Sequence, residues 1–259
     1  MSLWDYKNVE EFKEKAGYVI DGVWFPRVTK ILEIKEKPAL YFFYGQAASY
    51  RDARAITERS AEEGTMMHEA VEGILTGKND PILEEVRPGV EAFREFMDEK
   101  NIQVAPEHVE RRIVNHDHRY AGTIDTMALI DGRFGVLDIK TSQAIYRDYN
   151  LQTSAYMDAM KYEFPNLQTR WILRIDQIKS CLRCGASMRP KGGREKVRPG
   201  PVRGISLCPA AEHDWSELKG VVELKESPYW EQDFQAFLGA KKLWEWENDG
   251  WLEKAGYLG

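Results

Sequence analysis

The sequence predicts an α/β (α+β) protein in which helices flank a β-sheet. Residues 38–100 have helical patterning, residues 109–141 alternate like strands, and two further strand-like segments follow a later helix, at 169–175 and 220–225. With 259 residues, 43% of them hydrophobic and 30% charged, the chain is long enough to bury a core in one large domain, residues 1–259.

Composition places limits on where the protein works. No apolar run approaches the roughly 20 residues that a membrane-spanning helix needs, so we expect no membrane partner. The first residues, Met1-Ser-Leu-Trp-Asp-Tyr, have neither the basic start nor the apolar stretch of a signal peptide. A cytoplasmic location is therefore expected. The net charge of −6 does not exclude nucleic acid, because the distribution of charge matters more than its sum.

Local signals predict the N-terminal elements. Asp21-Gly22 is typical of a hairpin turn, and Thr29 is placed to cap a helix that begins at Lys30. Ser60-Ala-Glu-Glu63 has the pattern of a capping box, which predicts a helix from there to about Leu75, with Gly77 stopping it. A further helix is expected from Glu84 or Pro88 to Lys100.

The centre of the chain is predicted to be rich in strands. Residues 109–141 suggest three antiparallel strands, two of which, Tyr120 to Ile130 and Arg133 to Thr141, join at a turn at Asp131-Gly132. Downstream, a helix is expected over 150–162, and strand 220–225 is expected to pair with strand 169–175. An amphipathic helix over 228–249 completes the prediction.

Two acids and a lysine stand out in the predicted hairpin. Gly122-Thr-Ile-Asp125 lies on its first strand and Leu137-Asp138-Ile139-Lys140 on its second. Because side chains alternate along a strand, Asp138 and Lys140 point one way and Ile139 points into the core. Carboxylates that hold a hard cation, with an ammonium beside them, suit Mg²⁺-assisted phosphodiester cleavage. The alternative is a surface hairpin with a salt bridge.

Two weaker patterns flank the acids. Gly64, His68 and Glu72 recur every four residues and share one helix face, so His68 can supply a nitrogen ligand to the same metal, or it can be a satisfied, partly buried histidine. Gln152 and Tyr156 are also four residues apart, and can hydrogen-bond the lysine or contact a nucleic-acid backbone.

In this order the motifs resemble the RecB-like exonuclease branch of the PD-(D/E)XK nuclease superfamily. That branch shows a G-x-x-x-H-x-x-x-E helix, then G-x-x-D, D-x-K and Q-x-x-x-Y. The corresponding positions here are Gly64/His68/Glu72, Gly122/Asp125, Asp138/Lys140 and Gln152/Tyr156. The resemblance implies a restriction-endonuclease-like core, with a central mixed β-sheet flanked by helices.

The resemblance also implies a function, the metal-dependent hydrolysis of DNA. His68, Asp125, Asp138 and the backbone carbonyl of Ile139 would hold Mg²⁺ or Mn²⁺, and Lys140 would be the catalytic lysine. The expected activity is that of an exonuclease in recombination, repair or phage DNA processing. Members of this branch are sometimes fused to a helicase, which this chain lacks, so a helicase or a recombinase is an expected partner.

Two other functions stay open at this point. A structure-specific or sequence-specific endonuclease can be built on the same fold. A DNA-binding or assembly subunit that does not cleave is the other alternative, although the complete set of His68, Asp125, Asp138 and Lys140 favours an enzyme.

The cysteines lie in a segment of their own, predicted as an inserted module over residues 176–219. Cys181 and Cys184 form a C-x2-C pair, and after a gap of 23 residues Cys208 and His213 form C-x4-H. This spacing favours a structural, zinc-ribbon-like Zn²⁺ site over free thiols or an iron–sulfur cluster. An odd number of cysteines, three, also favours a reducing compartment.

The same segment concentrates positive charge. From Lys179 to Gly204 there are eight Lys or Arg and one acid, Glu195. If zinc orders this segment, we expect a DNA-facing arm, because phosphate neutralisation supplies most sequence-independent affinity. The competing possibility is a disordered, solvated loop.

Overall fold

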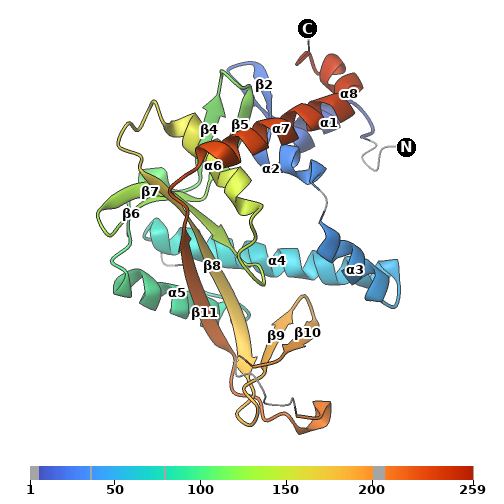
Figure 1. Cartoon of the computed structure of the whole chain (residues 1–259), viewed down its shortest axis with the longest axis vertical. Helices are drawn as coiled ribbons and strands as arrows, with labels where there is room; N and C mark the ends of the chain where they lie inside the picture. The colour runs from blue at the N-terminus through green and yellow to red at the C-terminus, as the bar shows by residue number, and fades with distance from the viewer. Residues whose placement is uncertain (1–5, 36, 79, 201–207, 259) are drawn as a thin grey trace.

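The computed structural model describes residues 6–35, 37–78, 80–200 and 208–258, and its centre is a seven-stranded sheet (Figure 1). The strand order is β10-β9-β8-β7-β6-β3, and β11 pairs with β8 as well. The pair β7 and β8 is parallel and the other pairs are antiparallel, which confirms the mixed sheet. The strands are β3 (Gln103–Val104), β6 (Thr126–Ile130), β7 (Arg133–Lys140), β8 (Thr169–Ser180), β9 (Ser187–Lys191), β10 (Arg194–Arg198) and β11 (Lys219–Glu226).

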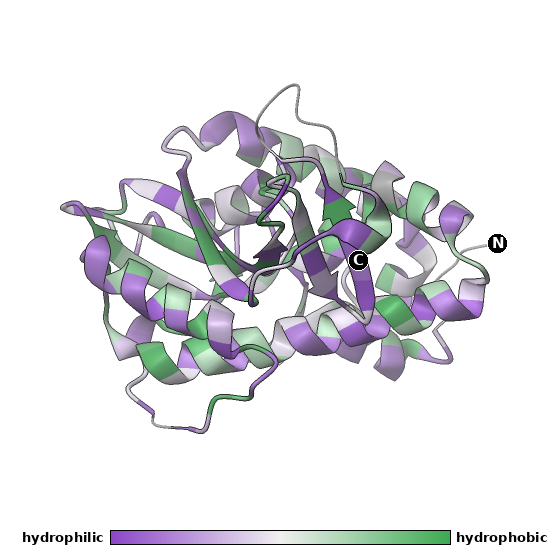
Figure 2. Ribbon diagram, turned by 90° about the horizontal axis from the view of Figure 1, so that it is seen from below, coloured by the Kyte–Doolittle hydropathy of each residue, from purple (hydrophilic) through white to green (hydrophobic). Residues whose placement is uncertain are grey.

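Helices cover both faces of this sheet, as predicted. On one face, α4 (Tyr50–Leu75) and α5 (Arg87–Glu99) bury Val71 and Phe93 against Leu137 and Leu173. On the other face, α6 (Tyr149–Met160) and α7 (Glu231–Glu247) bury their apolar residues together with Val136. Figure 2 shows hydrophobic and hydrophilic residues alternating along the helices, as expected where one side of each is buried.

The remaining elements lie around these layers. Two short sheets pair β1 (Gly17–Ile20) with β2 (Val23–Pro26), and β4 (Arg111–Asn115) with β5 (Tyr120–Ile124). The other helices are α1 (Val9–Ala16), α2 (Val28–Ile31), α3 (Pro38–Gln46) and α8 (Asp249–Lys254), with 3-10 turns at Leu32–Ile34, Pro106–His108 and Ala210–Glu212. None of the helices in the described ranges has the length and apolar character that crossing a membrane requires.

The predicted turns and the long-range strand pair are confirmed. Asp21 and Gly22, and likewise Asp131 and Gly132, have positive φ at both central positions, as two-residue hairpin turns require. Strand β11 pairs with β8 over its whole length, in a register that sets Val222 opposite Ile175.

The prediction of one strand from Tyr120 to Ile130 is wrong, because the strand breaks at Asp125. Before the break β5 pairs with β4, and after it β6 pairs with β7, so four strands in two sheets replace the expected three. At the break the carbonyl of Asp125 accepts the N–H of Glu110, and its carboxylate accepts the N–H of Ile139. These bonds replace the regular ladder at this residue.

Two predicted helix starts are also wrong. Helix α4 begins at Tyr50, where the Ser49 hydroxyl accepts the N–H of Asp52, so Ser60 lies inside the helix. Helix α2 begins at Val28 without a side-chain cap, so Thr29 is its second residue. In α4 the buried face already includes Ala53, and helical packing therefore continues upstream of the capping-box pattern.

Candidate active site and metal centre

Strand β7 presents apolar residues to one face of the sheet and a carboxylate to the other. Leu137 and Ile139 pack in the cluster under α4 and α5, which confirms the predicted core position of Ile139. Asp138 points to the α6 side and is fully buried, with 0% of its surface exposed. A buried carboxylate is costly unless polar partners surround it, so its neighbours define the site.

Asp125 lies beside Asp138 across the sheet. It directly precedes Thr126, which is paired with Leu137, and its Oδ2 accepts the backbone N–H of Ile139 at 2.6 Å. Burial raises the pKa of Asp138 to about 6, the nearby Lys140 opposes this, and Asp125 adds to it. Burial also raises the pKa of Asp125, with Lys140 again opposing. The break between β5 and β6 thus brings two interacting acids together.

Lys140 is the cation of this group. Its Nζ lies 2.7 Å from Asp138 Oδ2, and it also lies 5.3 Å from the centre of the Tyr149 ring. The two side chains therefore form an ion pair, and the Lys140 ammonium is the partner of the buried Asp138 Oδ2. Burial lowers the pKa of Lys140, but the attraction of Asp138 and Asp125 outweighs burial and leaves the pKa raised.

Helix α6 contributes the next two predicted residues. Gln152 Nε2 donates to Asp138 Oδ1 at 3.1 Å and to the Tyr156 hydroxyl at 2.9 Å. Tyr156 is buried, and its pKa is raised by burial and by Asp138 and Asp125. Gln152 therefore orients Asp138, and Tyr156 orients Gln152.

Helix α4 reaches the same group from the other direction. A Cβ on Gly64 would lie 3.0 Å from the Thr141 hydroxyl, so this glycine allows α4 to approach the residue after Lys140. Burial lowers the pKa of His68, Lys140 lowers it further, and Asp138 opposes them. His68 is therefore a neutral imidazole near Asp138 and Lys140, with a nitrogen lone pair available to a ligand.

A hollow of about 470 Å³ opens beside these residues, and its lining is acidic. It includes His68, Glu72, Thr141 and Glu110, of which Glu110 was not predicted as a site residue. Burial, together with Asp125 and Glu72, raises the pKa of Glu110 to about 7. The sequence around Glu110 carries no motif that identifies it, because its place depends on the backbone bond to Asp125.

The β9–β10 hairpin is a second contribution that sequence analysis missed. Arg189 Nη2 donates to the carbonyl of Thr141 at 3.0 Å, and Lys191 donates to the same oxygen. Arg189 is held in turn by Asp176 at 2.7 Å. The basic segment thus fixes the chain directly after Lys140.

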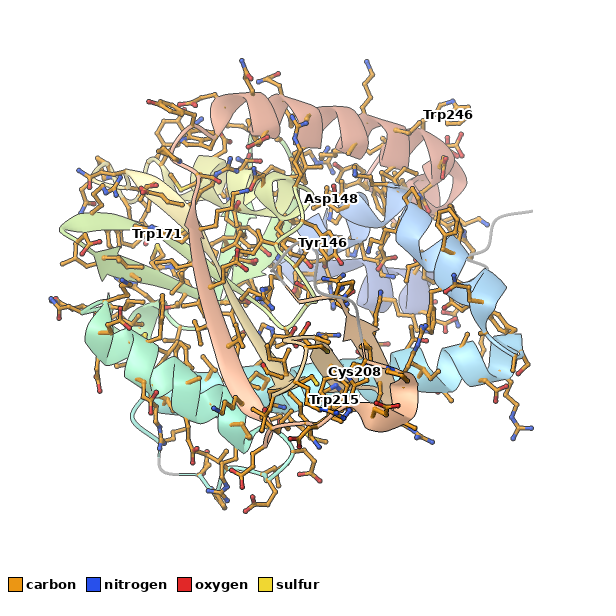
Figure 3. The ribbon with its side chains drawn as sticks, turned by 60° about the horizontal axis from the view of Figure 1, so that its bottom comes forward. Tyr146, Asp148, Trp171, Cys208, Trp215 and Trp246 are labelled. Atoms are coloured by element: carbon orange, nitrogen blue, oxygen red, sulfur yellow. The ribbon has the colours of Figure 1, made fainter. Side chains whose placement is uncertain are left out.

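The predicted cysteine and histidine ligands come together at the far end of β8. Ligand atoms of Cys181, Cys184, Cys208 and His213 all lie within 4.8 Å of one another, which is close enough to hold a metal ion such as zinc. His213 stacks on Trp215 with ring centres 4.5 Å apart, and Figure 3 shows Trp215 beside Cys208. Residues 201–207, including the basic Arg203, lie outside the described residues.

The thiols of the cluster differ in acidity. Burial raises the pKa of Cys181, but hydrogen bonds from the backbone of Cys184 and from the side chain of His213 outweigh burial and lower the pKa to about 6. Burial and the hydrogen bonds with Cys184 and Cys181 raise the pKa of Cys208 to about 11. A thiolate at neutral pH is the form that binds metals.

Within the described ranges this is the one group of three or more His, Cys, Asp or Glu side chains spaced to hold a metal ion. His68, Asp125 and Asp138 do not form such a group in this structure. The closest partner of Asp138 Oδ2 is Lys140 Nζ, and Asp125 Oδ2 is occupied by the N–H of Ile139. What the structure brings together at this place is two carboxylates, an ammonium and Gln152, with the imidazole of His68 near them.

No protein-family model matches the chain, and no curated protein is significantly similar to it.

Proposed function

We propose that the protein is a Mg²⁺- or Mn²⁺-dependent deoxyribonuclease with a PD-(D/E)XK site of the RecB-like kind. The observation that carries the proposal is the meeting of Asp125, Asp138, Lys140 and Gln152, from three separate stretches of chain. Burying two carboxylates and an ammonium costs free energy, and a fold does not need such a group for its stability. Such an arrangement is typical of a site where charge is used.

The ligand atoms around Asp138 have the chemistry that a hard divalent cation prefers. Carboxylate oxygens, a carbonyl oxygen and a neutral imidazole are suitable ligands, and the buried Asp138 Oδ2 already attracts one cation, the Lys140 ammonium 2.7 Å away. Asp125, Asp138, the carbonyl of Ile139 and His68 would hold the ion. When bound, the cation supplies Lewis-acid stabilisation of the phosphate and lowers the pKa of a water molecule.

The chain's own residues have the following roles in the hydrolysis. Lys140 orients the attacking water and stabilises negative charge on the phosphate. The water oxygen forms a bond to phosphorus while the bond to the leaving sugar oxygen breaks; the proton released by water passes to solvent, and the leaving oxygen takes one up. Gln152 and Tyr156 act as positioning residues, because they hold Asp138 in one orientation.

The Cys181, Cys184, Cys208 and His213 cluster is proposed to bind a structural Zn²⁺. Four ligands with no open position are typical of structural zinc sites. Through β9, the ordered segment would hold the carbonyl of Thr141 and so the end of β7.

The test is cleavage of end-labelled linear DNA with Mg²⁺ or Mn²⁺ by three proteins: the natural chain, Lys140→Met and Lys15→Met. Lys15 is a matched control, since its Nζ also lies 2.7 Å from a carboxylate, that of Glu11, but its side chain is on the exposed side of helix α1. We expect Lys140→Met to lose at least about 100-fold in rate and Lys15→Met to stay unchanged.

The same assay separates the related functions. Release of mononucleotides from linear DNA with no cutting of closed circles identifies an exonuclease, and cutting of circles identifies an endonuclease. DNA binding without cleavage under every divalent metal tried would refute the proposal in favour of a non-cleaving subunit.

A further inference from the structure

Helix α3 is exposed and aromatic, and its sequence, PALYFFYGQ, contains no charged residue. Tyr41 is 61% exposed and Phe42 is 73% exposed, and at the start of α4 the exposed Tyr50 stacks on Tyr44 with ring centres 5.7 Å apart. Exposed aromatic side chains that gather on one helix are typical of an interaction surface.

The β9–β10 hairpin places positive charge beside this helix. Burial lowers the pKa of Lys196, and the nearby positive charges of Arg198 and Arg194 lower it further. The Arg194 guanidinium lies over the ring of Phe43, 5.3 Å from its centre, so the aromatic and basic surfaces are continuous. Figure 1 shows α3 at the N-terminal end of α4 and the hairpin beside the same half of α4.

This combined surface leads to the candidate active site. The N–H of Gly192, at the tip of the hairpin, donates to Glu63 at 2.9 Å, next to Gly64 on α4. Lys196 donates to Gln143 at 3.2 Å, in the segment that follows Lys140. The same segment carries the exposed Tyr146, which is labelled in Figure 3.

We propose that α3 and the β9–β10 hairpin bind single-stranded DNA and direct it toward Lys140. Unpaired bases expose faces that can stack on Tyr41, Phe42 and Tyr146, whereas the bases of a duplex are already stacked. Arg194, Lys196 and Arg198 match the charge of the phosphate backbone. The delivery to Lys140 depends on the proposed nuclease function, but the binding itself does not.

The proposal is tested by the fluorescence anisotropy of labelled oligothymidylate and of a hairpin duplex, with the full chain and no added Mg²⁺ or Mn²⁺. The variant is Tyr41→Ala/Phe42→Ala. Its control, Tyr229→Ala/Trp246→Ala, removes two aromatics that are 87% and 72% exposed, the first just before α7 and the second on it. Figure 1 shows α7 well apart from α3. We expect only the first variant to weaken single-strand binding, by at least about tenfold, with duplex binding changed less than about twofold.

A second variant tests the basic part of the surface. Arg194→Gln/Lys196→Gln should weaken binding to both DNA forms and lower the salt dependence of single-strand binding by about 1.4 in log–log slope, since two cations are lost. The aromatic variant should keep the natural slope, because it removes no charge.

Three outcomes would overturn the proposal. The first is unchanged single-strand binding in the aromatic variant, and the second is an equal loss of binding to single strand and duplex. The third is a concentration-dependent dimer in light scattering that the aromatic variant no longer forms while its DNA binding persists. The last would assign the surface to a second copy of the chain. Failure of the nuclease proposal looks different. The natural chain would then leave DNA uncut under every divalent metal tried, or Lys140→Met would cleave as well as the natural chain, whatever the binding data show.

Discussion

Gly122 and Tyr156 meet where there is no room for another side chain. A Cβ on Gly122 would lie 2.7 Å from Cε1 of the Tyr156 ring. Through Gln152 the Tyr156 hydroxyl is connected to Asp138 Oδ1. A glycine on β5 therefore helps to set the orientation of a buried carboxylate on β7.

We expect Gly122→Ala to reduce cleavage by about 100-fold with the fold retained, because the added methyl displaces Tyr156 and with it the hydrogen bond to Asp138. The matched control is Gly239→Ala on α7, where an added Cβ meets nothing within 4 Å. Circular dichroism checks the fold, and end-labelled DNA measures the rate. A fully active Gly122→Ala protein would show that Tyr156 does not position the site.

The pH dependence of stability reports on Asp138. Its pKa is raised from 3.8 to about 6 on folding, so the native protein holds this proton more tightly than the unfolded chain does. The contribution of Asp138 to the free energy of unfolding is therefore greatest below pH 3.8. Up to about 3 kcal/mol of this free energy is lost as pH rises to about 6. Urea denaturation of Asp138→Asn should lack this fall.

The same shift predicts the pH dependence of cleavage. If Asp138 acts as a carboxylate ligand, Mg²⁺ must displace its proton, so at subsaturating Mg²⁺ the rate rises as pH passes about 6. A rate that is flat between about pH 5 and about pH 7 would contradict this role for the acid.

Metal analysis tests the cysteine cluster. Cys184→Ser should lose bound zinc and lower the melting temperature, because a four-ligand site loses a thiolate. Leu182→Ser is the matched control, since its exposed side chain lies between the two cysteines and outside the cluster. Equal zinc content in the two variants would contradict the proposal that the cysteine cluster binds zinc.

Replacing Arg170 should lower the free energy of unfolding, because this residue has a structural role. It is 1% exposed, pairs with Asp233, and donates to the carbonyls of Ser227 and Tyr229, which joins β8 to the start of α7. Arg170→Met should cost about 3–5 kcal/mol in urea denaturation, because buried acceptors lose their donor. Arg133→Met, which breaks the exposed pair with Glu226, should cost at most about 1 kcal/mol.

Much of the fold was predictable because its signals are local. Gly77 ends α4, Asp131-Gly132 makes the tight turn before β7, and the two-residue alternation places Asp138 and Lys140 on one face with Ile139 in the core. The spacing of the cysteines and His213 likewise predicted that they meet. Short-range backbone geometry determines the turns and the alternation, and the spacing typical of zinc ligands predicted the cluster.

The sequence by itself thus determined the turns, the alternation along β7 and the set of residues in the cysteine cluster. Only the tertiary structure decided the break at Asp125, the place of Glu110 beside it, and the contact of Arg189 with the carbonyl of Thr141. These depend on hydrogen bonds between segments far apart in the chain, and the patterns of hydrophobicity and turn residues that predict single elements carry no information about such bonds.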